Sequence, residues 1–157
     1  MKRLILPFIS LIILAACNNE KKHDGHNHDS KEVPKTQADS LMSDVMDGHD
    51  VGMAKYGRLK EVEKQISAAI DSVTKLPAKA QAAAAPYKEQ LDAAGKDIRG
   101  AIVAMDTWMQ EFNMDSAADN VEQRIKYLTD EKLKVGKVKE AILGSLQKAD
   151  SLFKAKL

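Results

Sequence analysis

The chain has 157 residues, and its 24 Lys and Arg side chains are nearly balanced by 23 Asp and Glu. This balance leaves no basic patch to attract nucleic acid, so we exclude a nucleic-acid partner. Aromatic residues make up only 4% of the chain, and Ala, Lys, Glu, Asp and Leu dominate, which is typical of long helices and coiled coils. With a single cysteine, the monomer has no internal disulfide and depends on helix packing for its stability.

The N-terminal segment has the layout of a secretory signal. Two basic residues, Lys2 and Arg3, precede an apolar run over 4–14, which is shorter than the roughly 20 residues that cross a bilayer as a helix. Two small residues and the only cysteine follow, as Leu14-Ala15-Ala16-Cys17. This pattern resembles the lipobox of bacterial lipoproteins.

The lipobox resemblance implies that residues 1–16 are removed and that Cys17 becomes the lipid attachment site. A diacylglyceryl group on the thiol and an acyl chain on the new amine would together hold the protein at the membrane. The next residue is Asn18, whereas Asp at this position is the usual signal for retention in the inner membrane. We therefore expect an outer-membrane lipoprotein of the cell envelope, and the sequence leaves open whether it faces the periplasm or the outside.

Residues 17–37 are predicted to form a flexible tether. The segment is polar, is broken by Gly25 and Pro34, and has too few apolar groups to offset the entropy of ordering. It carries three histidines among acidic neighbours: His23, His26 and His28. Imidazole and carboxylate groups bind Zn²⁺, Ni²⁺ or Cu²⁺, but a glycine-containing segment imposes no geometry on them. The tract is either a linker with incidental histidines or a weak metal-collecting tether.

From residue 38 onward, apolar residues recur at alternating spacings of three and four, the pattern of amphipathic helices. A first helix, capped by Asp39 or Ser40, should end at Pro77, and a second should begin near residue 82, with Pro86 kinking or restarting it. A third should begin after a break at 113–116, where Asp115 or Ser116 would be the N-cap. No run alternates with period two. We predict an all-α fold, an elongated antiparallel three-helix bundle over 38–157 with up-down-up order.

Glycines interrupt all three predicted helices. Gly57, Gly95 and Gly136 fall at similar heights in an antiparallel arrangement, and Gly100 lies one turn from the second of them. Either the backbones approach closely at a narrow waist or the helices share a kink there.

In the third helix, one position of the apolar stripe, near Glu131, is charged instead.

The distribution of methionines is another unusual feature of the sequence. If the first two helices are antiparallel and the chain turns back at Pro77, residue 49 should lie beside residue 103 or 104. All six methionines of the mature chain then lie at one end of the bundle. These are Met42, Met46, Met53, Met105, Met109 and Met114, with His49 on the stripe of the first three. Trp108 and Phe112 lie at the same end, and Tyr127 can approach them from the third helix.

Three interpretations of this methionine-rich end stay open. Methionine is a flexible core filler that packs well against aromatic rings. Thioether and imidazole groups are also ligands for Cu(I), and methionine-rich faces adapt to partner helices. No cofactor is required by the sequence. If a metal such as copper or zinc is bound, the candidate ligands are His23, His26, His28, Met42, Met46, His49, Met53, Met105 and Met109.

Short motifs in all three predicted helices resemble a known group of proteins. They are Val45-Met46-x-x-His49-Asp50-x-x-Met53, Met105-x-x-Trp108-Met109-x-x-Phe112, and the stretch from Tyr127-Leu128 to Lys137-Val138-Lys139. Similar motifs occur in small bacterial lipoproteins of uncharacterised function, some labelled "viral A-type inclusion protein". The resemblance covers most of residues 40–155. It implies a helical hairpin with a third helix and no known activity or catalytic residue.

Nothing in the sequence indicates catalysis. Carboxylates and lysines sit at the i,i+3 and i,i+4 spacings of solvated helix faces, and His49 is the only histidine outside the tether. We therefore predict a non-enzymatic structural or interaction module, attached to the membrane through Cys17 and contacting a protein partner or a second copy through its helices. The alternative is a periplasmic metal-binding lipoprotein that uses copper or zinc.

Overall fold

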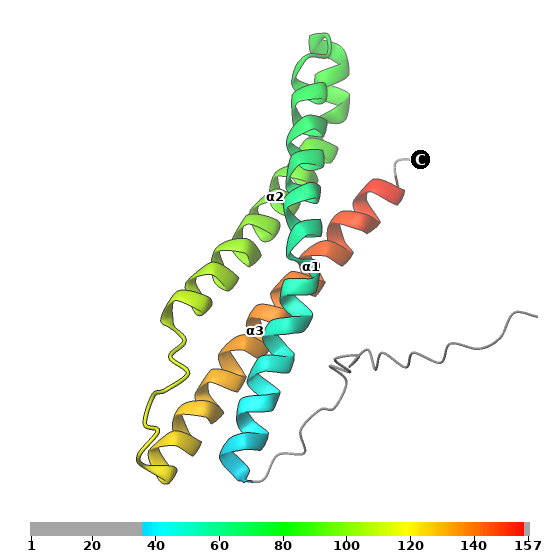
Figure 1. Ribbon diagram of the computed structural model, residues 1–157. Coiled ribbons are helices and arrows are strands. Elements are labelled where there is room, and N and C mark those ends of the chain that lie inside the picture. The colour runs from blue at the N-terminus through cyan, green and yellow to red at the C-terminus, as the bar shows by residue number, and fades with distance from the viewer. Residues whose placement is uncertain (1–35, 156–157) are drawn as a thin grey trace, which may run out of the picture. The chain divides into compact units, whose positions relative to one another are not determined.

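The computed structural model describes residues 36–155, so the signal segment and almost all of the predicted tether, including Cys17, His23, His26 and His28, lie outside the described residues. Three helices make up the described part: α1 (Gln37–Thr74), α2 (Ala78–Glu111) and α3 (Val121–Lys154) (Figure 1). Each helix packs against the other two, and residues 36–155 contain no strand. The predicted all-α three-helix bundle with up-down-up order is confirmed.

The first helix begins slightly earlier than predicted because a capping box forms at Thr36. The Thr36 hydroxyl accepts from the backbone N–H of Asp39 at 3.1 Å, and the Asp39 carboxylate accepts from the backbone N–H of Thr36 at 3.0 Å. Asp39 is therefore the acidic partner of the box and not the N-cap itself. Both orphan donors are satisfied, which fixes the start of α1.

The other two helix starts also differ from the prediction. Helix α2 already begins at Ala78, because the backbone N–H groups of Ala80 and Gln81 donate to the carbonyl of Pro77, and Pro86 is accommodated inside the helix. In α3 the N-cap is Asn120, whose side-chain oxygen accepts from the backbone N–H of Gln123 at 3.0 Å. The break between α2 and α3 is thus longer than the predicted 113–116.

The core consists of the three apolar stripes facing one another. Its largest fully buried side chains are Val45, Leu59, Val62 and Ile66 from α1, Leu91, Ile98 and Met105 from α2, and Leu128, Val135 and Ile142 from α3. Burial of one such side chain contributes roughly 1.5–3 kcal/mol relative to leaving it in water. The sequence pattern therefore identified the buried face correctly from Leu59 onward in α1. Near the start of α1, however, the buried positions are Val45, Gly48 and Gly52, each one residue before the predicted Met46, His49 and Met53.

The register between α1 and α2 differs from the one predicted by turning the chain back at Pro77. His49 faces Trp108, with 5.7 Å between ring centroids, instead of residues 103 and 104. Farther along α1, Gly52 packs against Met105. The offset is about one helical turn, because core packing sets how two helices slide past each other and the midpoint of the connecting turn does not.

The glycines of closest approach are not the predicted ones. A Cβ atom at Gly57, Gly100 or Gly136 would meet nothing within 4 Å, so these positions form no narrow waist. Two buried glycines of α1 approach α3: a Cβ at Gly48 would lie 2.9 Å from the Cγ1 atom of Val135, and one at Gly52 would lie 3.2 Å from the Cδ1 atom of Ile142. Gly95 is the one predicted waist position that does pack closely, with its Cβ position 3.3 Å from a methyl carbon of Ile66.

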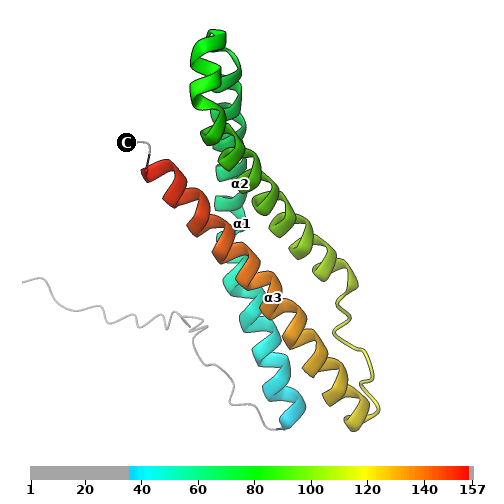
Figure 2. The ribbon, with the colours of Figure 1, turned by 180° about the vertical axis from the view of Figure 1, so that it is seen from behind.

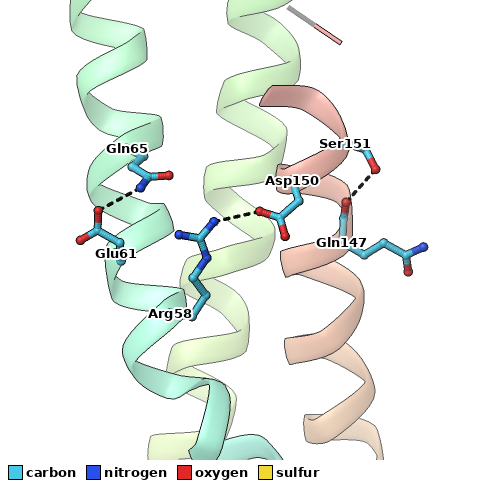
Figure 3. A network of polar contacts seen from close by, with 6 residues as sticks. All are labelled: Arg58, Glu61, Gln65, Gln147, Asp150 and Ser151. Atoms are coloured by element: carbon cyan, nitrogen blue, oxygen red, sulfur yellow. Dashed lines mark hydrogen bonds and ion pairs between the residues drawn. The ribbon is translucent and has the colours of Figure 1, made fainter. Parts of the chain in front are cut away.

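Ion pairs on the surface connect the helices. Lys132 pairs with Asp44 at 2.8 Å and Arg58 with Asp150 at 3.0 Å, both between α1 and α3, and the second pair is drawn in Figure 3 beside hydrogen bonds within single helices. The two pairs advance in the same direction along both helices, which shows that α1 and α3 are parallel. Exposed pairs contribute at most about 1 kcal/mol each, so they mark the register more than they stabilise it.

The α1–α2 hairpin extends beyond the C-terminal end of α3. Figure 1 and the reverse view in Figure 2 both show the turn of the hairpin well past the last turn of α3. Near this turn Val73 is buried, and the Gln81 side chain donates to the carbonyls of Thr74 and Leu76 at 2.8 and 2.7 Å. The three-helix core therefore occupies only part of the length of α1 and α2.

One hydrogen bond between α1 and α2 links stability to alkaline pH. The Tyr56 hydroxyl donates to the Asp106 carboxylate at 2.6 Å, and this bond, with smaller contributions from burial and from the Asp106 charge, raises the pKa of Tyr56. The folded state then keeps this proton to a higher pH than the unfolded chain. Its contribution to stability is therefore complete below pH ~10 and is lost as the pH rises through the raised pKa.

We expect Tyr56→Phe to lose less stability than the wild-type protein as the pH rises above about 10. Urea unfolding midpoints at a series of alkaline pH values measure this difference. The Lys134 pKa is also raised, by its hydrogen bond to Glu131, but Lys134 is present in both proteins and cancels in the comparison. Parallel pH profiles for the two proteins would contradict the prediction.

Candidate functional site

A pocket of about 160 Å³ opens where the first turns of α1 meet the end of α2. It is lined by Met46 and His49 of α1, by Trp108, Met109 and Phe112 of α2, and by Met114 of the following connection. Trp108 is 5% exposed, whereas Met109 and Met114 are 37% and 55% exposed. The pocket therefore has a buried aromatic floor and a lip of solvent-facing methionine side chains.

The structure brings only part of the predicted methionine cluster together. Met46, His49 and Met109 meet in the pocket, and Met114 lines it as well, although the sequence had not placed Met114 among the candidate ligands. The remaining three candidates of the bundle are Met42, Met53 and Met105, which do not line the pocket. Met105 is fully buried in the three-helix core, so it serves as core filler.

Four rings form a continuous row, of which His49, Trp108 and Phe112 line the pocket. Trp108 lies 5.7 Å from His49 and 4.9 Å from Phe112, measured between ring centroids, and Phe112 stacks on Tyr127 of α3 at 6.2 Å. The predicted approach of Tyr127 is confirmed. The Tyr127 hydroxyl also accepts from the backbone N–H of Asn113 at 2.8 Å, which holds the end of α2 against α3.

Glu131 explains the charged position in the apolar stripe of α3. It is 3% exposed, and its carboxylate accepts from the indole N–H of Trp108 at 2.9 Å and from the Lys134 ammonium at 2.7 Å. A buried indole requires an acceptor and a buried carboxylate requires donors, so each group satisfies the other. Sequence reasoning noticed the irregular position but missed this pairing, which the one tryptophan at a similar height could have indicated.

His49 is held by its sequence neighbour. Its Nδ1 atom lies 2.9 Å from a carboxylate oxygen of Asp50, and the Asp50 side chain itself is largely exposed. The Nε2 atom makes no hydrogen bond within residues 36–155, and no side-chain nitrogen or oxygen there is both buried and unbonded. Nε2 is therefore not a buried unbonded atom, and His49 is one of the side chains that line the pocket.

Two other hollows lie along grooves between helices. The α2–α3 groove, of about 480 Å³, has a floor of small residues such as Gly100 and Gly144 and is crossed by the Lys148–Asp97 ion pair. The α1–α3 groove contains the Arg58–Asp150 pair. Both are lined by solvated charges, and neither gathers histidine or methionine side chains.

Within residues 36–155, no group of three or more His, Cys, Asp or Glu side chains is placed to hold a metal ion. The donors that the structure does gather around His49 are methionine sulfurs.

No helix of this described part is long and apolar enough to cross a membrane. No family model, curated protein or solved structure matches the chain. The fold and the pocket together define an all-α three-helix bundle with one methionine-lipped surface site.

Proposed function

We propose that the protein is a non-enzymatic interaction module that is held at the bacterial cell envelope by a lipid on Cys17. The lipobox-like pattern at residues 14–17 supports the anchor, and the resemblance to small lipoproteins agrees with it. The pocket supports the interaction role. The observation that carries it is the exposure of Met109 and Met114 above a buried aromatic floor, since exposed apolar side chains around a hollow mark binding surfaces.

The floor is rigid and the lip is adaptable. Trp108 is fixed by its hydrogen bond to Glu131, and Phe112 is stacked between Trp108 and Tyr127. The lip consists of unbranched methionine side chains, which change shape at little cost and therefore fit different apolar partners. A rigid aromatic base with a flexible rim is suited to receive an apolar side chain of a partner protein.

The size and the chemistry of the pocket favour binding over catalysis. Its volume of about 160 Å³ is well below the roughly 300 Å³ or more of typical small-molecule sites, so it fits one large side chain or an ion. His49 is the only titratable side chain among the lining residues. The carboxylate next to His49, Asp50, is largely exposed and does not line the pocket, so the lining itself supplies no second group for acid-base or nucleophilic catalysis.

A single cross-linking experiment tests both parts of the proposal. A photo-reactive amino acid at position 114 should give a discrete protein adduct in cells, in the membrane fraction. The same probe at Val103, which is 61% exposed and lies outside the pocket, should not give it. In a Cys17→Ser background the protein and its adduct should leave the membrane fraction, because the lipid is no longer attached.

Two outcomes would refute the parts separately. Equal membrane association of the wild-type and Cys17→Ser proteins would refute the anchor. Identical adduct patterns from positions 114 and 103 would refute the pocket as the interaction surface while leaving the anchor intact.

A further inference from the structure

We infer that the methionine-lipped pocket is a binding site for a soft monovalent metal ion, namely Cu(I), with Ag(I) as its redox-inert analogue. The ligands are the Nε2 atom of His49 and the thioether sulfurs of Met46, Met109 and Met114. This inference does not rest on the interaction role proposed above, and an ion and a partner side chain would compete for the same small pocket.

The donor set selects the metal. Thioether sulfur is a soft ligand that favours Cu(I), and imidazole nitrogen also suits copper. No carboxylate or thiolate lines the pocket, so the harder Mg²⁺ and Ca²⁺ find none of their preferred oxygen ligands there, and Zn²⁺ finds only one of its usual ligands. Of the two metals that the sequence left open, the pocket therefore favours copper over zinc.

The hydrogen bond of His49 orients it as a ligand. Histidines that bind metals typically donate their other ring N–H to a carboxylate, which fixes the tautomer and raises the basicity of the ligating nitrogen. Asp50 supplies such a carboxylate, 2.9 Å from Nδ1. The lone pair is then on Nε2, the ring nitrogen that makes no hydrogen bond within residues 36–155.

The rest of the pocket fits a desolvated cation. Met46 and His49 are one helical turn apart on α1 and provide a fixed side, whereas the exposed Met109 and Met114 are free to close over the ion. Trp108, 5.7 Å from His49, offers an aromatic ring, and such rings attract cations that lie over their faces. A volume of about 160 Å³ leaves room for an ion among these side chains.

Trp108 is the only tryptophan in the chain, so its fluorescence reports on this pocket alone. We would titrate Ag(I), and Cu(I) without oxygen, into the full-length protein carrying Cys17→Ser, which removes the competing thiol. The expected result is quenching that saturates at one equivalent. Heavy-atom quenching requires contact between the ion and the indole, and a variant in which His23, His26 and His28 are replaced serves as the control for ions that the tether binds.

Matched variants separate a ligand from a packing residue. Met46→Leu and Met114→Leu should weaken binding by roughly tenfold or more, and Asp50→Asn by roughly tenfold through the lost orientation of His49. Met42→Leu and Met53→Leu, on the same helix but outside the pocket, should bind as the parent does. Leucine conserves the volume of methionine, and equal thermal midpoints would verify that every variant is folded.

Absence of quenching at one equivalent would overturn the inference. Equal loss of affinity in Met42→Leu and Met46→Leu would overturn it as well. Binding that persists in Met46→Leu and Met114→Leu but is lost when the three tether histidines are replaced would assign the metal to the tether instead of the pocket.

Discussion

Replacing Gly48 by leucine is expected to lower the free energy of unfolding by about 3 kcal/mol. Gly48 is buried, and even a Cβ atom there would lie 2.9 Å from Cγ1 of Val135. Val135 is itself 1% exposed and, being β-branched, has almost no alternative rotamer in a helix. A larger side chain must therefore push α1 away from α3, and urea unfolding measures the cost.

Gly57 provides the matched control on the same helix. A Cβ at Gly57 meets nothing within 4 Å, so Gly57→Leu should be neutral or stabilising by up to about 1 kcal/mol through helix propensity. If Gly48→Leu and Gly57→Leu had effects of the same sign and size, the close approach of α1 to α3 would be wrong. The Val135→Ala substitution should relieve part of the Gly48→Leu penalty, because the space beside residue 48 is then open.

The second large effect is expected at Trp108. Its replacement by alanine should lower the free energy of unfolding by about 3–5 kcal/mol, since a large buried ring is lost and its neighbours relax only partly. The loss also leaves Glu131 buried with Lys134 as its remaining partner. Unfolding by urea, followed by circular dichroism because the fluorophore is absent, measures the change.

A double-mutant cycle isolates the hydrogen bond between these two side chains. Trp108→Phe alone and Glu131→Leu alone should each cost about 1–3 kcal/mol, because each removes one partner of the buried hydrogen bond between the indole and the carboxylate. The double variant should cost clearly less than the two effects combined, since neither polar group then remains buried. Strictly additive losses would contradict the pairing of the indole with the carboxylate.

The number of helices and most of their buried positions were predictable from the sequence, apart from the start of α1, where Val45, Gly48 and Gly52 are buried. The spacing of residues such as Leu59, Ile98 and Ile142 places them on one stripe of each helix, and all three are fully buried. Helix ends were less predictable because several residues nearby can cap. At the start of α3, Asp115, Ser116 and Asn120 are all suitable N-cap residues, and only Asn120 accepts the capping hydrogen bond.

The composition of the pocket was predictable only in outline. A turn at Pro77 predicted correctly that the methionines lie at one end of the bundle. The predicted register was wrong by about one helical turn, and such a difference changes which side chains meet. In the structure Met53 and Met105 do not line the pocket, whereas Met114 does. A slide of one turn does not change the helical period of either segment, so no pattern within a single helix reveals it.

Local properties of the chain thus determined the helices, their apolar faces, the general position of the methionine-rich end and the lipobox-like pattern at Cys17. The tertiary structure alone decided that Gly48 is a contact between helices, that Glu131 is the acceptor for Trp108, and that the hairpin tip extends past α3. The physical reason is that helix formation depends on neighbours within a few residues. Register between helices depends instead on how all facing side chains pack together.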